Sequence, residues 1–129
     1  MIIGDSIGVG VAKERPECVS YVKGGINSYQ WNKKFSNISL GSKTVIISLG
    51  SNDHEGVRTI WELQQLRSKV TADRVFWIVP AIKPDVQRMV QTVAEQHNDV
   101  MLPITRLQPD GVHPSWAGYK QLADRTKEK

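Results

Sequence analysis

Ile2-Ile3-Gly4-Asp5-Ser6-Ile7-Gly8 is the segment from which the rest of the chain can be interpreted. Two β-branched residues lead into Gly-Asp-Ser, and a glycine follows two positions after the serine. This pattern is typical of a short strand that ends in a tight turn and presents a hydroxyl just before a helix. The Ser6 hydroxyl can cap that helix, or it can act as a nucleophile at the carboxyl end of a parallel sheet, where α/β proteins place their ligand sites.

A second informative segment, Gln108-Pro109-Asp110-Gly111-Val112-His113-Pro114, precedes a helix-like tail. Its aspartate and histidine are three residues apart and can lie on one side of one loop. A carboxylate that holds one imidazole nitrogen leaves the other nitrogen free to take a proton from a serine. The alternative is that Asp110 caps the final helix and His113 is a surface turn residue.

The third segment is Leu49-Gly50-Ser51-Asn52-Asp53, which follows a near-continuous apolar run. Such a run is typical of a strand buried on both faces. The side-chain amide of Asn52 can donate a hydrogen bond to a developing oxyanion. It can also form an Asx-turn that merely ends the strand. Asp53 is expected to hold the loop rather than to react.

With these three segments in this order, the chain resembles the SGNH (GDSL-type) hydrolases over most of its length. Gly4-Asp5-Ser6 resembles the nucleophile block of that family, residues 49–53 the block with the oxyanion asparagine, and Asp110-x-x-His113 the final block. Gly24-Gly25-Ile26-Asn27-Ser28 lies where the family has its second block, with an imperfect match. The resemblance implies a three-layer α/β/α sandwich whose five-stranded parallel sheet has the flavodoxin-like order 2-1-3-4-5.

The resemblance also implies the roles of the site residues. Ser6, His113 and Asp110 would form a catalytic triad, and the oxyanion would be held by the Ser6 backbone N–H, by Asn52 and by one backbone amide of the second block. Alignment places Ser28 where the family commonly has glycine, whereas a neighbouring placement selects Gly25. Ser28 can equally be only the N-cap of its helix.

Alternating strand-like and helix-like segments independently predict a parallel sheet with helices on both faces. The candidate serine, asparagine and histidine each follow a predicted strand, so all three are expected at the same edge of the sheet. The expected strands are residues 1–4, 19–22, 44–49, 74–79 and 100–102, and the expected helices are residues 6–13, 28–38, 57–70, 84–97 and 115–126.

The sequence also predicts roles for five further side chains. Asp5 is expected to accept backbone N–H bonds and brace the loops, not to serve as the triad acid. His54 can line the substrate cleft or lie solvated in its loop. Trp61, Trp77 and Trp116 fall at positions predicted to face the core. Trp116, which follows the final block closely, is also a candidate for stacking against substrate.

The composition suits one globular domain over residues 1–129, with 40% hydrophobic residues. The formal net charge of +4 would suit an acidic partner, but the charges are scattered, as on an ordinary solvated surface. The single cysteine, Cys18, excludes an internal disulfide and a cysteine-based metal cluster. The three histidines lack metal-ligand spacing, so neither a metal nor a cofactor is expected.

The cellular location and the oligomeric state can also be predicted from the sequence. No apolar run is long enough to span a bilayer, so no membrane span is expected. The first motif begins by residue 4 and leaves no room for a signal peptide. The chain is therefore expected to be cytoplasmic as synthesised, unless another export route is used or the chain was trimmed. A monomer is expected.

These patterns together predict a serine esterase that works through an acyl-enzyme. The short chain shows no evident lid, so a shallow cleft and a small acyl group, such as acetyl on a sugar or a cell-wall polymer, are expected. One alternative is an inactive module of the same fold that binds a glycan or a protein partner. The other, a nucleic-acid binder, is suggested only by the pI of about 9.3, and no interleaved aromatic and basic patch supports it.

Overall fold

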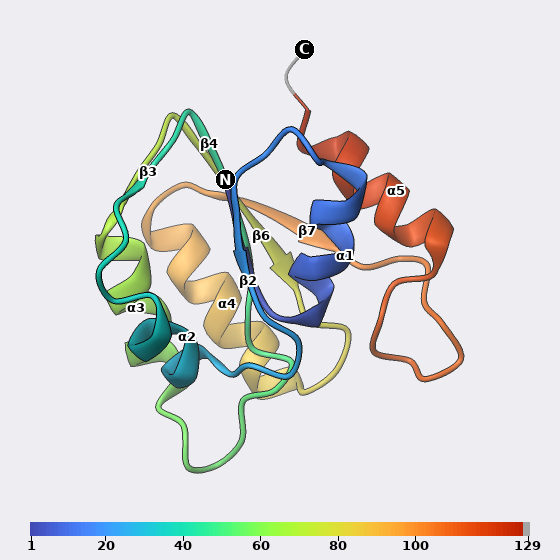
Figure 1. Cartoon of the computed structure of the whole chain (residues 1–129). Helices are drawn as coiled ribbons and strands as arrows, with labels where there is room; N and C mark the ends of the chain where they lie inside the picture. The colour runs from blue at the N-terminus through green and yellow to red at the C-terminus, as the bar shows by residue number, and fades with distance from the viewer. Residues whose placement is uncertain (128–129) are drawn as a thin grey trace.

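The computed structural model of this protein describes residues 1–127 and contains a five-stranded parallel sheet (Figure 1). Across the sheet, the strands have the order β2-β1-β4-β6-β7. Numbered within this sheet alone, that order is 2-1-3-4-5, which confirms the predicted topology. The strands are β1 (Ile2–Gly4), β2 (Ser20–Val22), β4 (Thr44–Ser48), β6 (Arg74–Val79) and β7 (Val100–Pro103).

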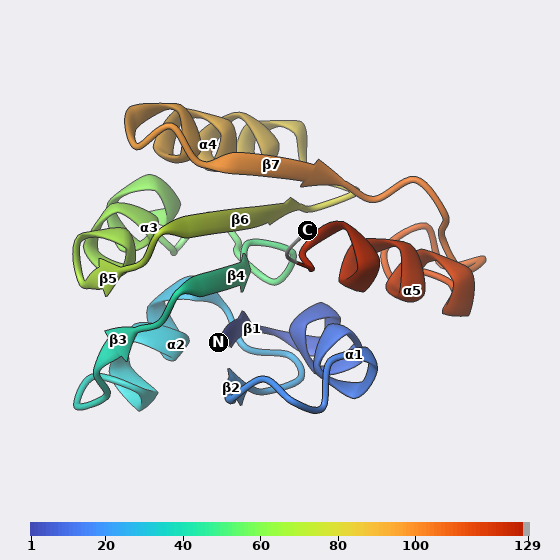
Figure 2. The same ribbon diagram turned by 90° about the horizontal axis from the view of Figure 1, so that it is seen from above.

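Helices cover both faces of the sheet and complete the predicted three-layer sandwich (Figure 2). Two helices, α1 (Ser6–Glu14) and α5 (Trp116–Arg125), lie on one face. The other face is covered by α2 (Ser28–Lys34), α3 (Thr59–Ser68) and α4 (Pro84–Gln96). Among the described residues, no helix has the length and apolar character that crossing a bilayer requires.

The core divides into two clusters because side chains alternate along each central strand. Ile47 and Trp77 pack towards α2, α3 and α4. Their neighbours Ile46 and Ile78 pack towards α1 and α5. All four side chains are at most 1% exposed. Burial on both faces explains the near-continuous apolar runs that the sequence shows in these strands.

A second, two-stranded parallel sheet was not predicted. It pairs β3 (Leu40–Gly41) with β5 (Val70–Thr71) at the amino-terminal side of the main sheet. Each of these strands has only two residues, which is too short for a period-two pattern to appear in the sequence.

The expectation that three tryptophans face the core is correct for Trp77 and wrong for Trp61 and Trp116. Trp77 is fully buried, whereas Trp61 is 44% and Trp116 75% exposed. The buried positions of α3 are Thr59, Glu62, Leu63 and Leu66, so residue 61 lies outside the buried face of that helix and points outward. Trp116 is the first residue of α5 and precedes its buried positions.

Two glycines allow α5 to approach its neighbours closely. A Cβ atom on Gly10 of α1 would lie 2.2 Å from the ring of Tyr119. A Cβ atom on Gly118 would lie 2.3 Å from the carbonyl oxygen of Arg106. Because no side chain intervenes, α5 packs directly on α1 and on the segment that leads into it. This packing brings the loop before α5 beside the start of α1.

Candidate active site

Ser6, His113 and Asp110 form one hydrogen-bonded chain at the carboxyl edge of the main sheet. The Ser6 Oγ atom lies 2.8 Å from His113 Nε2, although the two residues are 107 positions apart in the sequence. His113 Nδ1 lies 2.8 Å from Asp110 Oδ2. Ser6 lies two residues after the end of β1, and the other two residues lie in the loop between β7 and α5 (Figure 1). This arrangement is the geometry that a serine–histidine–carboxylate triad requires.

The surroundings of Asp110 determine which imidazole nitrogen carries the proton. The backbone N–H groups of Val112 and His113 donate to Asp110 Oδ1 at 2.9 and 3.0 Å. The Val112 N–H, followed by the His113 side chain and N–H, lowers the pKa of Asp110 to about 2. The carboxylate is therefore ionised at neutral pH and can only accept hydrogen bonds. Neutral His113 must then hold its proton on Nδ1 and accept from the Ser6 hydroxyl through Nε2.

Helix capping does not explain the positions of Ser6 and Asp110, the two ends of the hydrogen-bonded series. Asp5 is the N-cap of α1, and its Oδ1 atom accepts a hydrogen bond from the Ile7 N–H at 3.0 Å. The cap of α5 is Ser115, whose Oγ accepts from the Gly118 N–H at 3.1 Å. Ser6 is instead the first residue of α1, where the positive end of the helix dipole favours developing negative charge.

The Asp53 carboxylate connects the second and third blocks beneath the site. It accepts from the Ser28 N–H at 2.9 Å, from Ser28 Oγ at 2.6 Å and from Thr59 Oγ1 at 2.8 Å. All three residues are at most 5% exposed. Asp53 therefore holds its loop, as the sequence suggested, and fixes the start of α3 as well.

This network changes the expectation for Ser28. Because its backbone N–H already donates to Asp53, that amide is not available to an oxyanion. Ser28 is not the N-cap of α2 either, since Asn27 has that position and forms a capping box with Gln30. The second block approaches the nucleophile at Gly24–Gly25 instead, because a Cβ atom on Gly24 would lie 3.9 Å from the Ser6 Cβ atom.

Asn52 and Lys83 hold the loop after β4. The Asn52 Nδ2 atom donates to the Ile26 carbonyl at 3.0 Å, and its second N–H remains for another acceptor. Lys83 Nζ donates to the backbone carbonyls of Ser51 at 2.8 Å and Asp53 at 2.6 Å. The sequence did not point to Lys83, because both acceptors are backbone atoms about 30 residues away and leave no side-chain pattern.

A cavity of about 410 Å³ opens beside the nucleophile. It is bordered by Lys13, Gln108, Trp116 and Tyr119 as well as by Ser6. The side chain of His113 is 35% exposed and that of Asp110 is 46% exposed. The site is therefore an open cleft, as expected.

His54, a candidate substrate-binding residue, lies apart from this cavity. Its side chain is exposed, and its Nδ1 atom accepts from the Gly56 N–H at 3.2 Å. It borders a different cavity, beside α2 and α3, together with Asn27 and Trp61. The structure thus places His54 and Trp116 beside separate cavities, and only that of Trp116 includes Ser6.

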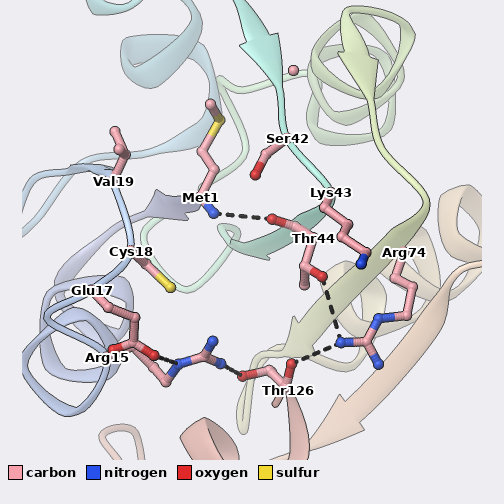
Figure 3. Close-up of a pocket in the computed structure, with 11 residues that line it drawn as sticks. Met1, Arg15, Glu17, Cys18, Val19, Ser42, Lys43, Thr44, Arg74 and Thr126 are labelled. Atoms are coloured by element: carbon pink, nitrogen blue, oxygen red, sulfur yellow. Dashed lines mark hydrogen bonds and ion pairs between the residues drawn. The ribbon is translucent and has the colours of Figure 1, made fainter. Parts of the chain in front are cut away.

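A further cavity, of about 370 Å³, lies at the amino-terminal edge of the sheet (Figure 3). There Arg15 Nη1 donates to Thr126 Oγ1 at 2.6 Å, and Arg74 Nη2 donates to the Thr126 carbonyl at 3.2 Å. Thr126 is the C-cap of α5. The two arginines therefore anchor the far end of the helix whose first turn follows His113.

Asp5 is a buried carboxyl group directly below the nucleophile. Burial raises its pKa to about 6, although the N–H groups of Ile7 and Gly8 oppose this shift. Its Oδ2 atom has no hydrogen-bond partner among residues 1–127. Because this pKa lies above the ordinary value of 3.8, the folded protein holds the Asp5 proton more tightly than the unfolded chain. The contribution of Asp5 to stability therefore falls as the pH rises from about 4 to about 6.

Asp5→Asn is expected to remove this pH dependence, since asparagine keeps the N-cap acceptor without a charge. Relative to wild type, the variant should gain on the order of 2 kcal/mol in free energy of unfolding between pH 4 and pH 7. Urea denaturation at several pH values measures the gain, with exposed Asp85→Asn as the control. Parallel stability curves for wild type and Asp5→Asn would contradict this account.

Comparisons with known proteins support the fold. No family model matches this chain, and no curated protein matches its sequence. A crystal structure of a proposed acylhydrolase from Bacteroides fragilis NCTC 9343 matches it with a TM-score of 0.66 and 20% sequence identity. The match covers 95% of this chain and 81% of that chain. At this identity the likeness shows the α/β/α fold.

Within residues 1–127, no group of three or more histidine, cysteine, aspartate or glutamate side chains could hold a metal ion.

Proposed function

We propose that this protein is a one-domain serine ester hydrolase of the SGNH type. The observation that carries the proposal is the hydrogen-bonded chain from Ser6 Oγ through His113 to Asp110. An unassisted serine hydroxyl is a weak nucleophile at neutral pH, and a neighbouring imidazole base activates it. Helix capping and a surface turn, the other roles that the sequence suggests for these residues, do not explain why all three groups meet.

The first half of the reaction transfers the acyl group to the enzyme. Ser6 Oγ attacks the ester carbonyl carbon while its proton moves to His113 Nε2, and a tetrahedral oxyanion forms. As the ester C–O bond breaks, the imidazolium returns the proton to the departing alcohol. Ionised Asp110 stabilises the imidazolium and keeps the ring in place. In the second half, His113 deprotonates a water molecule that attacks the acyl-enzyme, and the acid is released with Ser6 restored.

Three donors are proposed for the oxyanion. The first is the Ser6 N–H, which starts α1 and has no hydrogen-bond partner among residues 1–127. The second is the N–H of Asn52 Nδ2 that does not bind Ile26. The third is the Gly25 N–H, since the Ser28 amide is bound to Asp53. Removal of one such donor typically lowers turnover by about 10²–10³-fold.

The cleft suits a small acyl group, such as acetyl, carried on a carbohydrate or wall polymer. Lys13, Glu14 and Gln108 border the cavity beside Ser6, so it offers no extended apolar channel for a long acyl chain. The exposed Trp116 ring is the proposed stacking surface for a sugar, and Lys120 Nζ lies 5.8 Å from its centroid. We expect the protein to act as a monomer.

The acyl preference provides the experiment. The kcat/KM for para-nitrophenyl acetate should exceed that for para-nitrophenyl octanoate by about tenfold or more, because the longer chain finds no apolar pocket. Initial rates for a series of chain lengths measure this ratio. A preference for octanoate would overturn the small-acyl assignment, and no hydrolysis of any ester in the series would overturn the proposed function.

A further inference from the structure

Two exposed aromatic side chains border one cavity of about 550 Å³ beside α2 and α3. Tyr29 is 47% exposed and Trp61 is 44% exposed. The two helices pack side by side, and the segment between β4 and α3 passes next to them (Figure 1). The volume is in the range of ligand sites. We call this cavity the aromatic groove, and its lining includes Asn27, Tyr29, Gln30, Val57, Arg58 and Trp61.

A cationic side chain lies beside each aromatic ring of the groove. The Arg58 guanidinium carbon lies 4.7 Å from the Trp61 ring centroid, and Lys33 Nζ lies 5.7 Å from that of Tyr29. Arg58 has no carboxylate partner within residues 1–127. Glu62 also borders the groove, but it is only 6% exposed. The groove therefore offers aromatic surface together with an unpaired guanidinium.

A second, smaller cavity borders the aromatic groove at Gln30 and the turn beside the nucleophile at Gly24–Gly25. Gln30 borders both cavities, and the second one, of about 320 Å³, is also lined by Lys23, Lys34 and the turn Gly24–Gly25. That turn approaches Ser6, as the 3.9 Å separation between the Cβ position of Gly24 and the Ser6 Cβ shows. Two lysines thus border the cavity that lies between the turn beside Ser6 and the aromatic groove.

We propose that the aromatic groove is a second binding site, which holds sugar units of an anionic polysaccharide while an acylated unit of the same polymer lies at Ser6. The placement of an acylated unit at Ser6 rests on the proposed function. Apolar faces of sugar rings stack on Tyr29 and Trp61, as aromatic side chains allow. The planar Arg58 guanidinium matches a sugar carboxylate or phosphate in bidentate geometry. The Gln30 side-chain amide can donate to a sugar hydroxyl.

Aromatic rings beside cations also occur in sites for single-stranded nucleic acid. The polysaccharide is favoured here because the second cavity borders both the groove and the turn beside the proposed ester-hydrolysing centre, and sugar hydroxyls commonly carry acyl esters. Nucleic acid therefore becomes an alternative outcome of the test.

The test measures binding without turnover. Affinity electrophoresis of the full chain in gels that contain de-esterified polygalacturonate gives a dissociation constant for wild type, Trp61→Ala, Trp61→Phe and Arg58→Ala. Arg88→Ala is the matched control, because Arg88 is an exposed arginine on α4 that does not line the groove. Thermal unfolding confirms that each variant is folded. Gels with neutral dextran and titration with a single-stranded oligothymidylate provide the comparisons.

Wild type is expected to bind polygalacturonate more tightly than dextran or oligothymidylate. Trp61→Ala and Arg58→Ala should each weaken this binding about tenfold or more. Trp61→Phe should retain most of the wild-type binding, and Arg88→Ala should not change it. Tighter binding of oligothymidylate, equal loss in Arg88→Ala, or no binding of polygalacturonate by wild type would overturn the proposal. The binding test uses a polymer without esters, so it is independent of the hydrolysis assay. Ester hydrolysis without polymer binding would refute the groove proposal alone. Polymer binding without ester hydrolysis would refute the proposed function alone.

Discussion

Ser6→Ala is expected to lower kcat/KM for para-nitrophenyl acetate by about 10³-fold or more. Alanine removes the only atom that can form the acyl-enzyme and leaves His113 without its proton donor. The remaining oxyanion donors can support only slow attack by water. Steady-state rates of the wild type and the variant measure the loss. Ser42→Ala, a serine at the opposite edge of the sheet, serves as the matched control and should retain wild-type activity.

Removal of the base is expected to lower activity nearly as much as removal of the nucleophile. His113→Gln keeps a polar side chain but cannot accept and return a proton as imidazole does, so a similar loss is expected. The two losses should not add in the Ser6→Ala/His113→Gln double variant, because both residues act in one step. Hydrolysis that continues unchanged in Ser6→Ala, or losses that multiply in the double variant, would contradict the shared mechanism.

The largest effect on stability is expected for Asp53→Ala. This change leaves the Ser28 N–H, the Ser28 hydroxyl and the Thr59 hydroxyl buried without their acceptor. Each buried donor that loses its partner costs about 1–3 kcal/mol, so the free energy of unfolding should fall by about 3 kcal/mol or more. Urea denaturation followed by circular dichroism measures this loss.

Two variants control the Asp53 prediction. Asp53→Asn keeps one carbonyl oxygen in place and should lose less stability than Asp53→Ala. Asp85→Ala removes an exposed carboxylate on α4 and should change stability by less than about 0.5 kcal/mol. A loss below about 1 kcal/mol in Asp53→Ala would show that this carboxylate does not hold the second and third blocks together.

The sequence predicted the parts of this protein that short segments encode. The strand order followed from the resemblance to the SGNH hydrolases, and the meeting of Ser6 with His113 followed from motifs that each come after a strand. Asp110 and His113 share one loop, so their contact depended on only a few residues. Parallel strands then placed the separate motifs at one edge of the sheet without any detailed side-chain information.

Long-range contacts between loops could not be predicted in the same way. The hydrogen bond from the Ser28 N–H to the Asp53 carboxylate joins residues 25 positions apart. Nothing in the local sequence indicates that this N–H would donate to Asp53. The outward direction of Trp61 depends on how α3 is rotated, which its buried polar residues Thr59 and Glu62 obscure. The aromatic groove was missed for the same reason, since Tyr29 and Trp61 become neighbours of one cavity only after α2 packs on α3.

Covalent labelling tests the proposed nucleophile most directly. The wild-type protein is treated with a fluorophosphonate probe, digested, and analysed by mass spectrometry to locate the modified residue, with His113→Gln treated in parallel. We predict one adduct on Ser6 in the wild type and little or none in His113→Gln. An adduct on a different residue, or ester hydrolysis by a protein whose Ser6 stays unmodified, would contradict the account.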